Sequence, residues 1–574
     1  MAFEAQTRGQ NFYLADANLR AVLARLAPAA LAKCDHVLAD FGAWVGSAVH
    51  AEAEFTDREA RPVLETYDRD GEVVNRIRYN PVWQETSAEA YRRGVVGLNY
   101  GDDPAPYVVT FAMGYLLSQS DVSLHCPVTM TGAVAYVLDQ FAPPAMRARY
   151  LPELVRTDGH ALTGGTWATE LHGGSDVGAT STTARAEGGH VRLDGLKWFA
   201  SNVDGGLAVA TARPEGAPEG SRGLGLYLVP MHLDDGSANP MRIRRLKEKL
   251  GTCGIATGEI DLTDTWALEI APPPMGFKLM MEALEFSRIH NAMSAVGLQR
   301  RAVLEALAYL SHREAFGHNV LDYPMMRDEI LKMVVAQEAG CALAFEAAAA
   351  FDAAHATDLA SDDDGARAWM RMVTSLAKYV TAEDANQVCR AAIELIGGNA
   401  YTYDYVTPRL LRDAQVLTVW EGPANIQALE VLRMVGNRYP GFEALSGRVD
   451  RTLASVPAAL GDLAAAVRDA FGTGREAVDR LRADPQQGPR DARRLMGLMA
   501  DTLAAALLVE EAALGHAAGD GRKAIIARLF IEQRLAPPAN RGLGEDRAWA
   551  HGHFDALIAC EPIALDEPAK RATG

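Results

Sequence analysis

Cysteine is scarce in this chain of 574 residues, and its few cysteines are far apart. No C-x-x-C pair occurs among the six, which are Cys34, Cys126, Cys253, Cys341, Cys389 and Cys560. A disulfide framework or a zinc site would need paired or clustered cysteines, so neither is expected, and no metal ligands are predicted. Buried thiols in a reducing compartment are the simpler interpretation.

Targeting signals and positive charge are also lacking. Residues 1–10 contain no basic stretch followed by an apolar one, which argues against a signal peptide. No run of about 18 uninterrupted apolar residues occurs, so no membrane span is expected. The formal net charge is −18, so a bulk attraction to nucleic acid or to anionic lipid is not expected either. We therefore predict a cytoplasmic protein.

The pattern of apolar residues changes along the chain. Residues 1–158 are rich in Ala and Leu at helical spacing, with one predicted hairpin at 68–81 that turns at Asp70-Gly71. Residues 159–272 carry strand signals, including a predicted turn at Asp194-Gly195 and a period-two pattern at Leu224, Leu226 and Leu228. The sequence therefore predicts a β module inside a helical protein.

Helical periodicity returns after Pro272-Pro273-Pro274 and continues, apart from an acidic segment at 358–367 predicted to be a solvated loop. A last helical stretch has a predicted break at 484–491. We expect a mainly α fold with an embedded β-barrel. The four predicted domains are an N-terminal helical domain (1–158), a β-barrel domain (159–272), a helical-bundle domain (273–440) and a C-terminal helical extension (441–574).

Four segments have residue types suited to a phosphate-bearing cofactor and to acid–base chemistry. The segment 166–184 (TWATELHGGSDVGATSTTA) has adjacent glycines, whose backbone N–H groups can approach phosphate closely. The segment 197–202 (KWFASN) combines aromatic and hydroxyl side chains, and 311–317 (SHREAFG) has an arginine whose planar fork suits phosphate. Taken singly, a Gly-rich turn and an ordinary barrel strand explain the first two segments better, and a surface arginine at a helix end is a plausible explanation of the third. The fourth segment, 394–427, ends in VWEGPANIQ.

Taken together and in order, these segments resemble the acyl-CoA dehydrogenase family, most of all its AidB-type branch, named for the adaptive response to alkylation. The resemblance covers 105–436 and is strongest from 160 to 436. It implies the acyl-CoA dehydrogenase fold, with a helical domain, a small β-barrel and a four-helix-bundle domain. It also implies FAD as cofactor, an acyl-CoA substrate, an electron-transfer partner and a homotetramer built as a dimer of dimers.

The resemblance assigns roles to matched residues. It implies that Glu421 is the catalytic base and that Glu285 and Arg288 bind the CoA part of the substrate; for Arg288, a helix-surface position explains the residue almost as well. Isovaleryl-type members carry their base where this chain has Ser287, which leaves Glu421 as the candidate. The residues implied to bind FAD are Trp167, Ala168, Thr169, Ser175, Phe199, Ser201, Arg313, Phe316, Glu394, Gly397, Gly398, Pro423 and Asn425.

Three positions depart from the family pattern. Glu394 stands where the family often has Gln, and Pro423 and Asn425 stand where it has Thr and Gln or Glu. Proline cannot donate a hydroxyl hydrogen bond to FAD, whereas the amide of Asn425 can still donate.

Two other functions fit parts of the sequence. An AidB-like protein that binds DNA and protects it from alkylation would need a basic surface. The stretches 242–251 (RIRRLKEKLG) and 521–528 (GRKAIIAR) are candidates for it, although solvated helix faces explain them better. A flavin oxidase acting on nitroalkanes would use Asp as its base, so Glu421 favours a dehydrogenase.

Overall fold

The protein is described by a computed structural model that covers residues 7–355, 364–537 and 548–565. Its contacts divide the chain into two compact units, one formed by Met1–Ala39 with Asn291–Gly574 and the other by Asp40–His290. The chain passes between the units within helix α2 (Pro28–Trp44) and again within helix α8 (Met275–Leu310). This division groups the barrel with the helices that precede it and the extension with the bundle, so the four finer domains stay a prediction.

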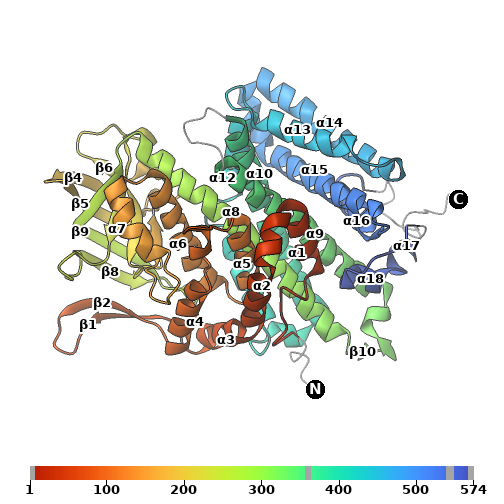
Figure 1. Ribbon diagram of the computed structural model, residues 1–574, viewed down its shortest axis with the longest axis horizontal. Coiled ribbons are helices and arrows are strands. Elements are labelled where there is room, and N and C mark those ends of the chain that lie inside the picture. The colour runs from red at the N-terminus through yellow and green to blue at the C-terminus, as the bar shows by residue number, and fades with distance from the viewer. Residues whose placement is uncertain (1–6, 356–363, 538–547, 566–574) are drawn as a thin grey trace. The chain divides into compact units, whose positions relative to one another are not determined.

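The unit 40–290 is built around a closed barrel of five strands. The strand order is β6-β4-β5-β9-β7, and β7 pairs back with β6 to close the barrel, while β3 joins at β6 and β8 joins at β9. The embedded barrel is thus confirmed (Figure 1). Its strands are β3 (Gly164–Trp167), β4 (Thr183–Glu187), β5 (His190–Ser201), β6 (Leu207–Pro214), β7 (Gly225–Pro230), β8 (Met241–Leu246) and β9 (Thr257–Ala271).

The predicted turn at Asp194-Gly195 is wrong. Both residues lie inside the continuous strand β5, at a shift in its register with β9. The chain turns instead at Gly188-Gly189, whose φ angles of +56° and +95° are those that tight hairpins require. Gly195 serves close packing, because a Cβ there would lie 2.3 Å from the Thr182 hydroxyl oxygen.

The predicted hairpin at Asp70-Gly71 is confirmed. Strands β1 (Val63–Tyr67) and β2 (Val73–Arg78) pair antiparallel, and Gly71 has a φ of +88°. Figure 1 shows this hairpin reaching out below strand β8, to which the Asn75 side chain bonds through the carbonyl of Met241. The period-two pattern of Leu224, Leu226 and Leu228 correctly predicted a strand. It did not predict a buried and an exposed face, because β7 is buried on both faces.

Helices fill the rest of this unit. They are α3 (His50–Arg58), α4 (Pro81–Arg92), α5 (Tyr107–Ser118), α6 (Val122–Phe141) and α7 (Pro144–Leu154), followed by the first part of α8. His125 of α6 and His290 of α8 lie with Nε2 and Nδ1 2.9 Å apart. Burial lowers the pKa of His125 to about 3 and also lowers the pKa of His290, so both rings are neutral and pack as part of the core.

The other unit is a helical bundle to which the extension is added. Its bundle helices are α9 (Pro324–His355), α10 (Asp364–Ile396), α11 (Thr407–Leu417) and α12 (Ala424–Val435), with the second part of α8. By length and composition α9 could cross a membrane, but 94% of its most apolar window is buried, as in a core helix. Of the predicted acidic loop, residues 358–363 lie outside the described residues. For residues 364–367 the prediction is wrong, because helix α10 already begins at Asp364.

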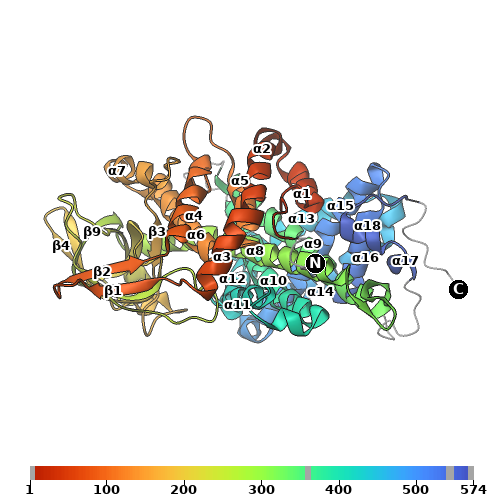
Figure 2. The ribbon, with the colours of Figure 1, turned by 90° about the horizontal axis from the view of Figure 1, so that it is seen from below.

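The extension consists mainly of α13 (Gly441–Ala454), α14 (Gly461–Ala483), α15 (Gly488–Ala517) and α16 (Arg522–Arg534), followed by the short helices α17 (Ala548–His551) and α18 (Phe554–Ala559). The predicted break at 484–491 is confirmed in part, because α14 ends at Ala483 and α15 begins at Gly488. Helix α15 packs on α9, α10 and α12, and the N-terminal helix α1 (Ala17–Leu26) also packs on α9 (Figure 2).

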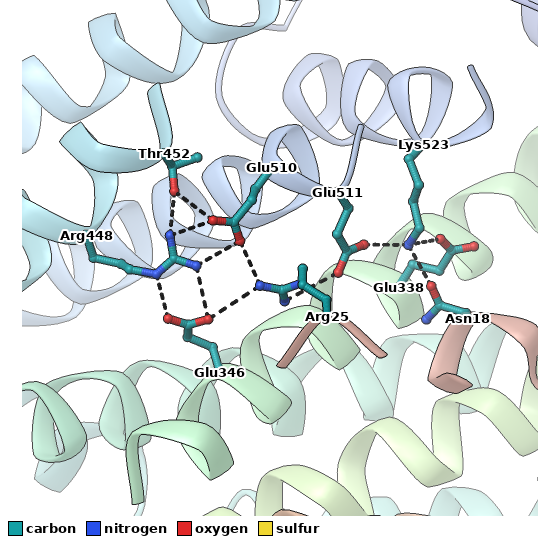
Figure 3. Close-up of polar contacts among 9 residues, drawn as sticks. All are labelled: Asn18, Arg25, Glu338, Glu346, Arg448, Thr452, Glu510, Glu511 and Lys523. Carbon is teal, nitrogen blue, oxygen red and sulfur yellow. Dashed lines mark hydrogen bonds and ion pairs between the residues drawn. The ribbon is translucent and has the colours of Figure 1, made fainter. Parts of the chain in front are cut away.

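Charged side chains join these helices in a buried network (Figure 3). Arg448 of α13 pairs with Glu346 of α9 at 2.6 Å and with Glu510 of α15 at 2.8 Å. Arg25 of α1 pairs with the same Glu510 at 2.7 Å. Lys523 of α16 donates at 2.7 Å both to Glu338 of α9 and to Glu511 of α15. The extension therefore supplies the counter-charges for buried carboxylates of the bundle.

Candidate active site

The two cofactor motifs of the barrel lie side by side. The backbone N–H of Trp198 donates to the carbonyl of Thr169 at 3.0 Å, which joins the segment after β3 to strand β5. The Trp167 side chain is 1% exposed and packs in the barrel core. Ala168 and Thr169 are only partly buried. Of these three predicted cofactor residues, Ala168 and Thr169 are the ones whose side chains can face a ligand.

The loop that follows is closed by the Glu170 carboxylate. It accepts hydrogen bonds from the backbone N–H and hydroxyl groups of Ser181 and Thr182, and from the Lys197 ammonium at 2.8 Å. Burial raises the pKa of Glu170, but the Lys197 charge and these hydrogen bonds outweigh it and lower the pKa to about 2. The loop so closed presents Gly174 and Ser175 to the outside.

Strand β5 presents an aromatic ring and a hydroxyl on one face. Phe199 is 54% exposed, which is unusual for so large an apolar side chain, while Ala200 between Phe199 and Ser201 is fully buried. Strand β5 has a register shift against β9 between Lys197 and Ala200, and past that shift the alternation of side chains puts Phe199 and Ser201 on one face, with the buried Ala200 on the other. The Ser201 hydroxyl lies 3.0 Å from that of Thr257 on the neighbouring strand β9.

An exposed ring, a hydroxyl on the same face and a Gly-Ser loop fit a flavin and its diphosphate. The ring can pack on an isoalloxazine system, the hydroxyl can bond its polar edge, and the loop's backbone N–H groups can meet phosphate. The sequence prediction named Phe199, Ser201 and Ser175. It did not name Lys197 or Thr257, because Lys197 acts through Glu170 and Thr257 acts through Ser201, and each of these partners is distant in sequence.

In the bundle unit, Glu421 lies in the short turn between α11 and α12. Its φ is +57° and that of Gly422 is +92°, so a side-chain-bearing residue is held in the left-handed region. The Gln427 amide donates to the carbonyls of Glu421 and Gly422, at 3.0 Å each, and the Lys378 ammonium donates to the Gly422 carbonyl at 2.8 Å. Strain of this kind persists only where the surroundings hold it, and it is concentrated at functional sites.

Two predicted cofactor residues, Pro423 and Asn425, follow Glu421 at the start of α12. Pro423 precedes the first turn of α12, and Asn425 is exposed on that turn. Both residues therefore lie at the start of α12, close to Glu421 in the chain.

The remaining predicted cofactor residues of this unit are mostly exposed. Arg313 precedes a small hairpin of β10 (Glu314–Ala315) and β11 (His318–Asn319), at whose tip Phe316 is 96% exposed. Gly397 has a φ of +87°, and Gly398 begins the short helix η7 (Gly398–Tyr401). The amide of Asn399 donates to the Tyr309 hydroxyl near the end of α8 at 3.1 Å, which brings this turn close to the segment of Arg313. Glu394 is exposed and pairs with Arg390.

Arg288 is buried on α8 and forms an ion pair with Glu285 one turn earlier. This burial rules out the helix-surface interpretation of Arg288. The Ser287 hydroxyl between them donates to the carbonyl of Ala283, so it is engaged within its own helix.

The basic stretches considered for DNA binding are largely neutralised. Arg522 is buried and Lys523 is partly buried, and both pair with Glu338. On the other stretch, Arg244 pairs with Asp261, while Arg245 and Lys247 both pair with Glu259. These side chains are already bound to carboxylates, which argues against both stretches as a phosphate-binding surface.

Three family models match successive parts of the chain. They are the AidB N-terminal domain over residues 4–158, the acyl-CoA dehydrogenase middle domain over 165–265 and the acyl-CoA dehydrogenase C-terminal domain over 275–436. Among curated proteins, acyl-CoA dehydrogenase family member 11 of Caenorhabditis elegans is 32% identical over 77% of this chain and 73% of its own length. The putative acyl-CoA dehydrogenase AidB of Escherichia coli is 30% identical over 71% of this chain and 75% of its own length.

Solved structures agree with these matches. The ACDH-11 protein of Caenorhabditis elegans, in complex with C11-CoA, superposes with a TM-score of 0.85 at 28% identity and covers 96% of both chains. The apo form of Bd2924 superposes with a TM-score of 0.79 at 29% identity, over 88% of this chain and 99% of its own.

Proposed function

Since the chain belongs to the acyl-CoA dehydrogenase family, we propose that it oxidises an acyl-CoA thioester with FAD, forming a double bond between the α and β carbons. The observation that carries this proposal is the strained Glu421, held by Gln427 and Lys378 in a turn that resembles the family's catalytic segment. Support for the substrate class comes from the related structure in complex with C11-CoA.

In the proposed reaction Glu421 takes up the α-proton. Bound FAD would supply the hydride acceptor for the β-hydrogen, so that one proton and one hydride would leave the substrate and both electrons are accounted for. The thioester carbonyl gains negative charge as the α-proton leaves, and the Glu421 backbone N–H is a suitable donor to it. Removing the proton and stabilising the charge at one residue requires that its backbone be fixed, which the Gln427 and Lys378 contacts do.

The barrel residues are proposed to hold the cofactor. Phe199 would pack on the flavin ring and Ser201 would bond its polar edge, while the loop closed by Glu170 would meet the diphosphate. Ala168 and Thr169 would complete the flavin contact. These roles are supported by exposure and by the type of each side chain.

Anaerobic titration of the purified holoprotein with a panel of acyl-CoAs tests the proposal. The panel should contain short, medium, long and branched chains, including the eleven-carbon chain bound by the related structure. We expect at least one member to bleach the flavin absorbance. A holoprotein that no acyl-CoA bleaches, although dithionite does, would contradict the proposal.

We also propose that FAD binding depends on assembly into a homotetramer, a dimer of dimers. The exposed Arg313 and Phe316 and the turn at Gly397-Gly398 are suited to contact a neighbouring subunit's cofactor. Arg313→Ala should then weaken FAD retention more than Arg288→Ala, because Arg288 is buried against Glu285. Monomers that hold FAD as tightly as the assembly would contradict this.

We further propose that the protein passes its electrons to an electron-transfer partner and that it is cytoplasmic.

Two findings favour the AidB-like alternative: the match of residues 4–158 to the AidB N-terminal domain, and the 30% identity with the putative acyl-CoA dehydrogenase AidB of Escherichia coli. In that alternative the protein binds DNA and protects it from alkylation damage. Exposed arginines such as Arg480 and Arg494 are then the better candidates for phosphate contacts, although each pairs with a neighbouring carboxylate. Binding should be weak and should fall steeply with salt. Retention at low salt that an Arg480→Gln/Arg494→Gln variant loses would support this alternative; no retention by the intact protein would oppose it.

A further inference from the structure

A lysine outside the cofactor motifs is linked to the predicted flavin contact by two hydrogen bonds. Lys249 lies between β8 and β9, and its Nζ is 2.9 Å from the Thr257 hydroxyl oxygen and 2.9 Å from the Ile255 carbonyl oxygen. Thr257 pairs with Ser201 across β9 and β5, and their hydroxyl oxygens are 3.0 Å apart. The three side chains therefore form a continuous line of polar atoms.

The direction of each bond follows from chemistry and burial. An ammonium group can only donate, so Thr257 accepts from Lys249. Thr257 is 4% exposed, and a buried hydroxyl proton needs an acceptor. Within the described part of the chain the acceptor within reach of that proton is the Ser201 oxygen. Thr257 therefore donates to Ser201, and the proton of the partly buried Ser201 hydroxyl is left for another acceptor.

We propose that Lys249 and Thr257 orient Ser201 as a hydrogen-bond donor to a carbonyl oxygen of the flavin, and that this relay favours the reduced cofactor. The proposal rests on the FAD site described above. Hydride transfer brings the flavin two electrons and one proton, so the ring gains one negative charge. A donor backed by a cation stabilises a carbonyl that takes up this charge more than it stabilises the neutral oxidised ring.

The neighbouring Lys247 does not have this role. Its ammonium lies 3.4 Å from the centre of the Trp198 ring and 4.8 Å from that of Phe199, but it also pairs with the buried Glu259 at 2.6 Å. Its charge is therefore compensated beside the ring. Lys247→Met serves as the matched control, since it removes a lysine two residues from Lys249 and leaves the Thr257 hydroxyl in place.

The test measures the flavin midpoint potential of FAD-loaded variants against a reference dye. Ser201→Ala, Thr257→Val and Lys249→Met should each lower the preference for reduced over oxidised FAD about tenfold, which is about 30 mV for a two-electron couple. Thr257→Ser should restore the wild-type potential, and Lys247→Met should leave it nearly unchanged.

A double variant separates a relay from a general disturbance of the barrel. If Lys249 acts through Ser201, Lys249→Met should have little further effect in a Ser201→Ala background. Additive effects, or wild-type potentials in Thr257→Val and Lys249→Met, would overturn the proposal. FAD content and thermal unfolding of the apoproteins show whether each variant folds. Failure of the wild type itself to bind FAD would count against the cofactor site and not against the relay alone.

Discussion

At the scale of single residues, the ion pair between Glu170 and Lys197 is the clearest source of pH dependence. The lowered pKa of Glu170, about 2, lies below its ordinary value of 4.5. Its contribution to stability is therefore complete above pH 4.5 and is lost as the pH falls from there towards 2. The difference corresponds to about 3 kcal/mol.

Glu170→Gln should remove this part of the pH dependence and lower the free energy of unfolding at pH 7. Lys197→Met should cost more, because it leaves a buried carboxylate without its cation, typically about 3–5 kcal/mol. Thermal unfolding of apoprotein between pH 3 and 7 measures both. Parallel curves for Glu170→Gln and wild type would show that the pair does not titrate as described.

The residue scale also shows what sequence can and cannot predict. Glu421, Phe199 and Ser201 stand in contiguous motifs, so a resemblance could identify them from the sequence alone. The partners Thr257 and Lys249 are 56 and 48 residues beyond Ser201, counted from their numbers, and only the pairing of β5 with β9 brings Thr257 there. A local sequence pattern cannot predict such a contact between distant residues.

At the scale of elements, the turn between α11 and α12 should depend on the side chains that hold it. Gln427→Met or Lys378→Met removes donors to the carbonyls of Glu421 and Gly422. We expect flavin reduction by a reactive acyl-CoA to slow by about 10–10² because the base is misplaced, with FAD content retained. Rapid-mixing absorbance measurements decide it; reduction at the wild-type rate in both variants would show that the turn is held by other contacts.

The wrong prediction of a turn at Asp194-Gly195 is also explained by how the strands pack. An Asp-Gly pair between apolar arms is a strong hairpin signal, yet Asp194-Gly195 lies within β5 and the nearby Gly188-Gly189 makes the turn. Glycine is needed at position 195 because a larger side chain would collide with Thr182, which is a tertiary contact. At Gly71 a Cβ would meet open space, and the same signal predicted the turn correctly.

At the scale of the whole molecule, the buried ion network makes the extension part of the bundle unit. Arg25 and Glu510 are 485 residues apart in sequence yet share a hydrogen bond, so this arrangement could not be predicted from local patterns. Removing residues 443–574 would leave Glu338 and Glu346 of α9 without Lys523 and Arg448. We expect such a truncation to unfold or aggregate, so point variants are the better test of any role for the extension.

Arg25→Met should accordingly destabilise this unit by about 3 kcal/mol, because it takes from Glu510 and Glu511 a cation that both share in a largely buried site. Arg494→Met is the matched control: Arg494 is 82% exposed, and its pair with Asp491 should contribute within about 0.5 kcal/mol. Chemical unfolding followed by far-UV circular dichroism compares the two. Equal stability of both variants would mean that the network contributes little.

The central claim is that Glu421 removes the α-proton of an acyl-CoA while FAD is reduced, and one measurement tests it most directly. Stopped-flow absorbance follows flavin reduction by an acyl-CoA that bleaches the wild-type holoprotein, in wild type and in Glu421→Gln. The substitution keeps the shape of the side chain and, as judged by FAD content and circular dichroism, should keep the fold. We predict that it slows reduction by about 10²–10⁴, the usual loss on removing a general base. A Glu421→Gln protein that is bleached as fast as wild type would contradict the account, because the base would then lie elsewhere.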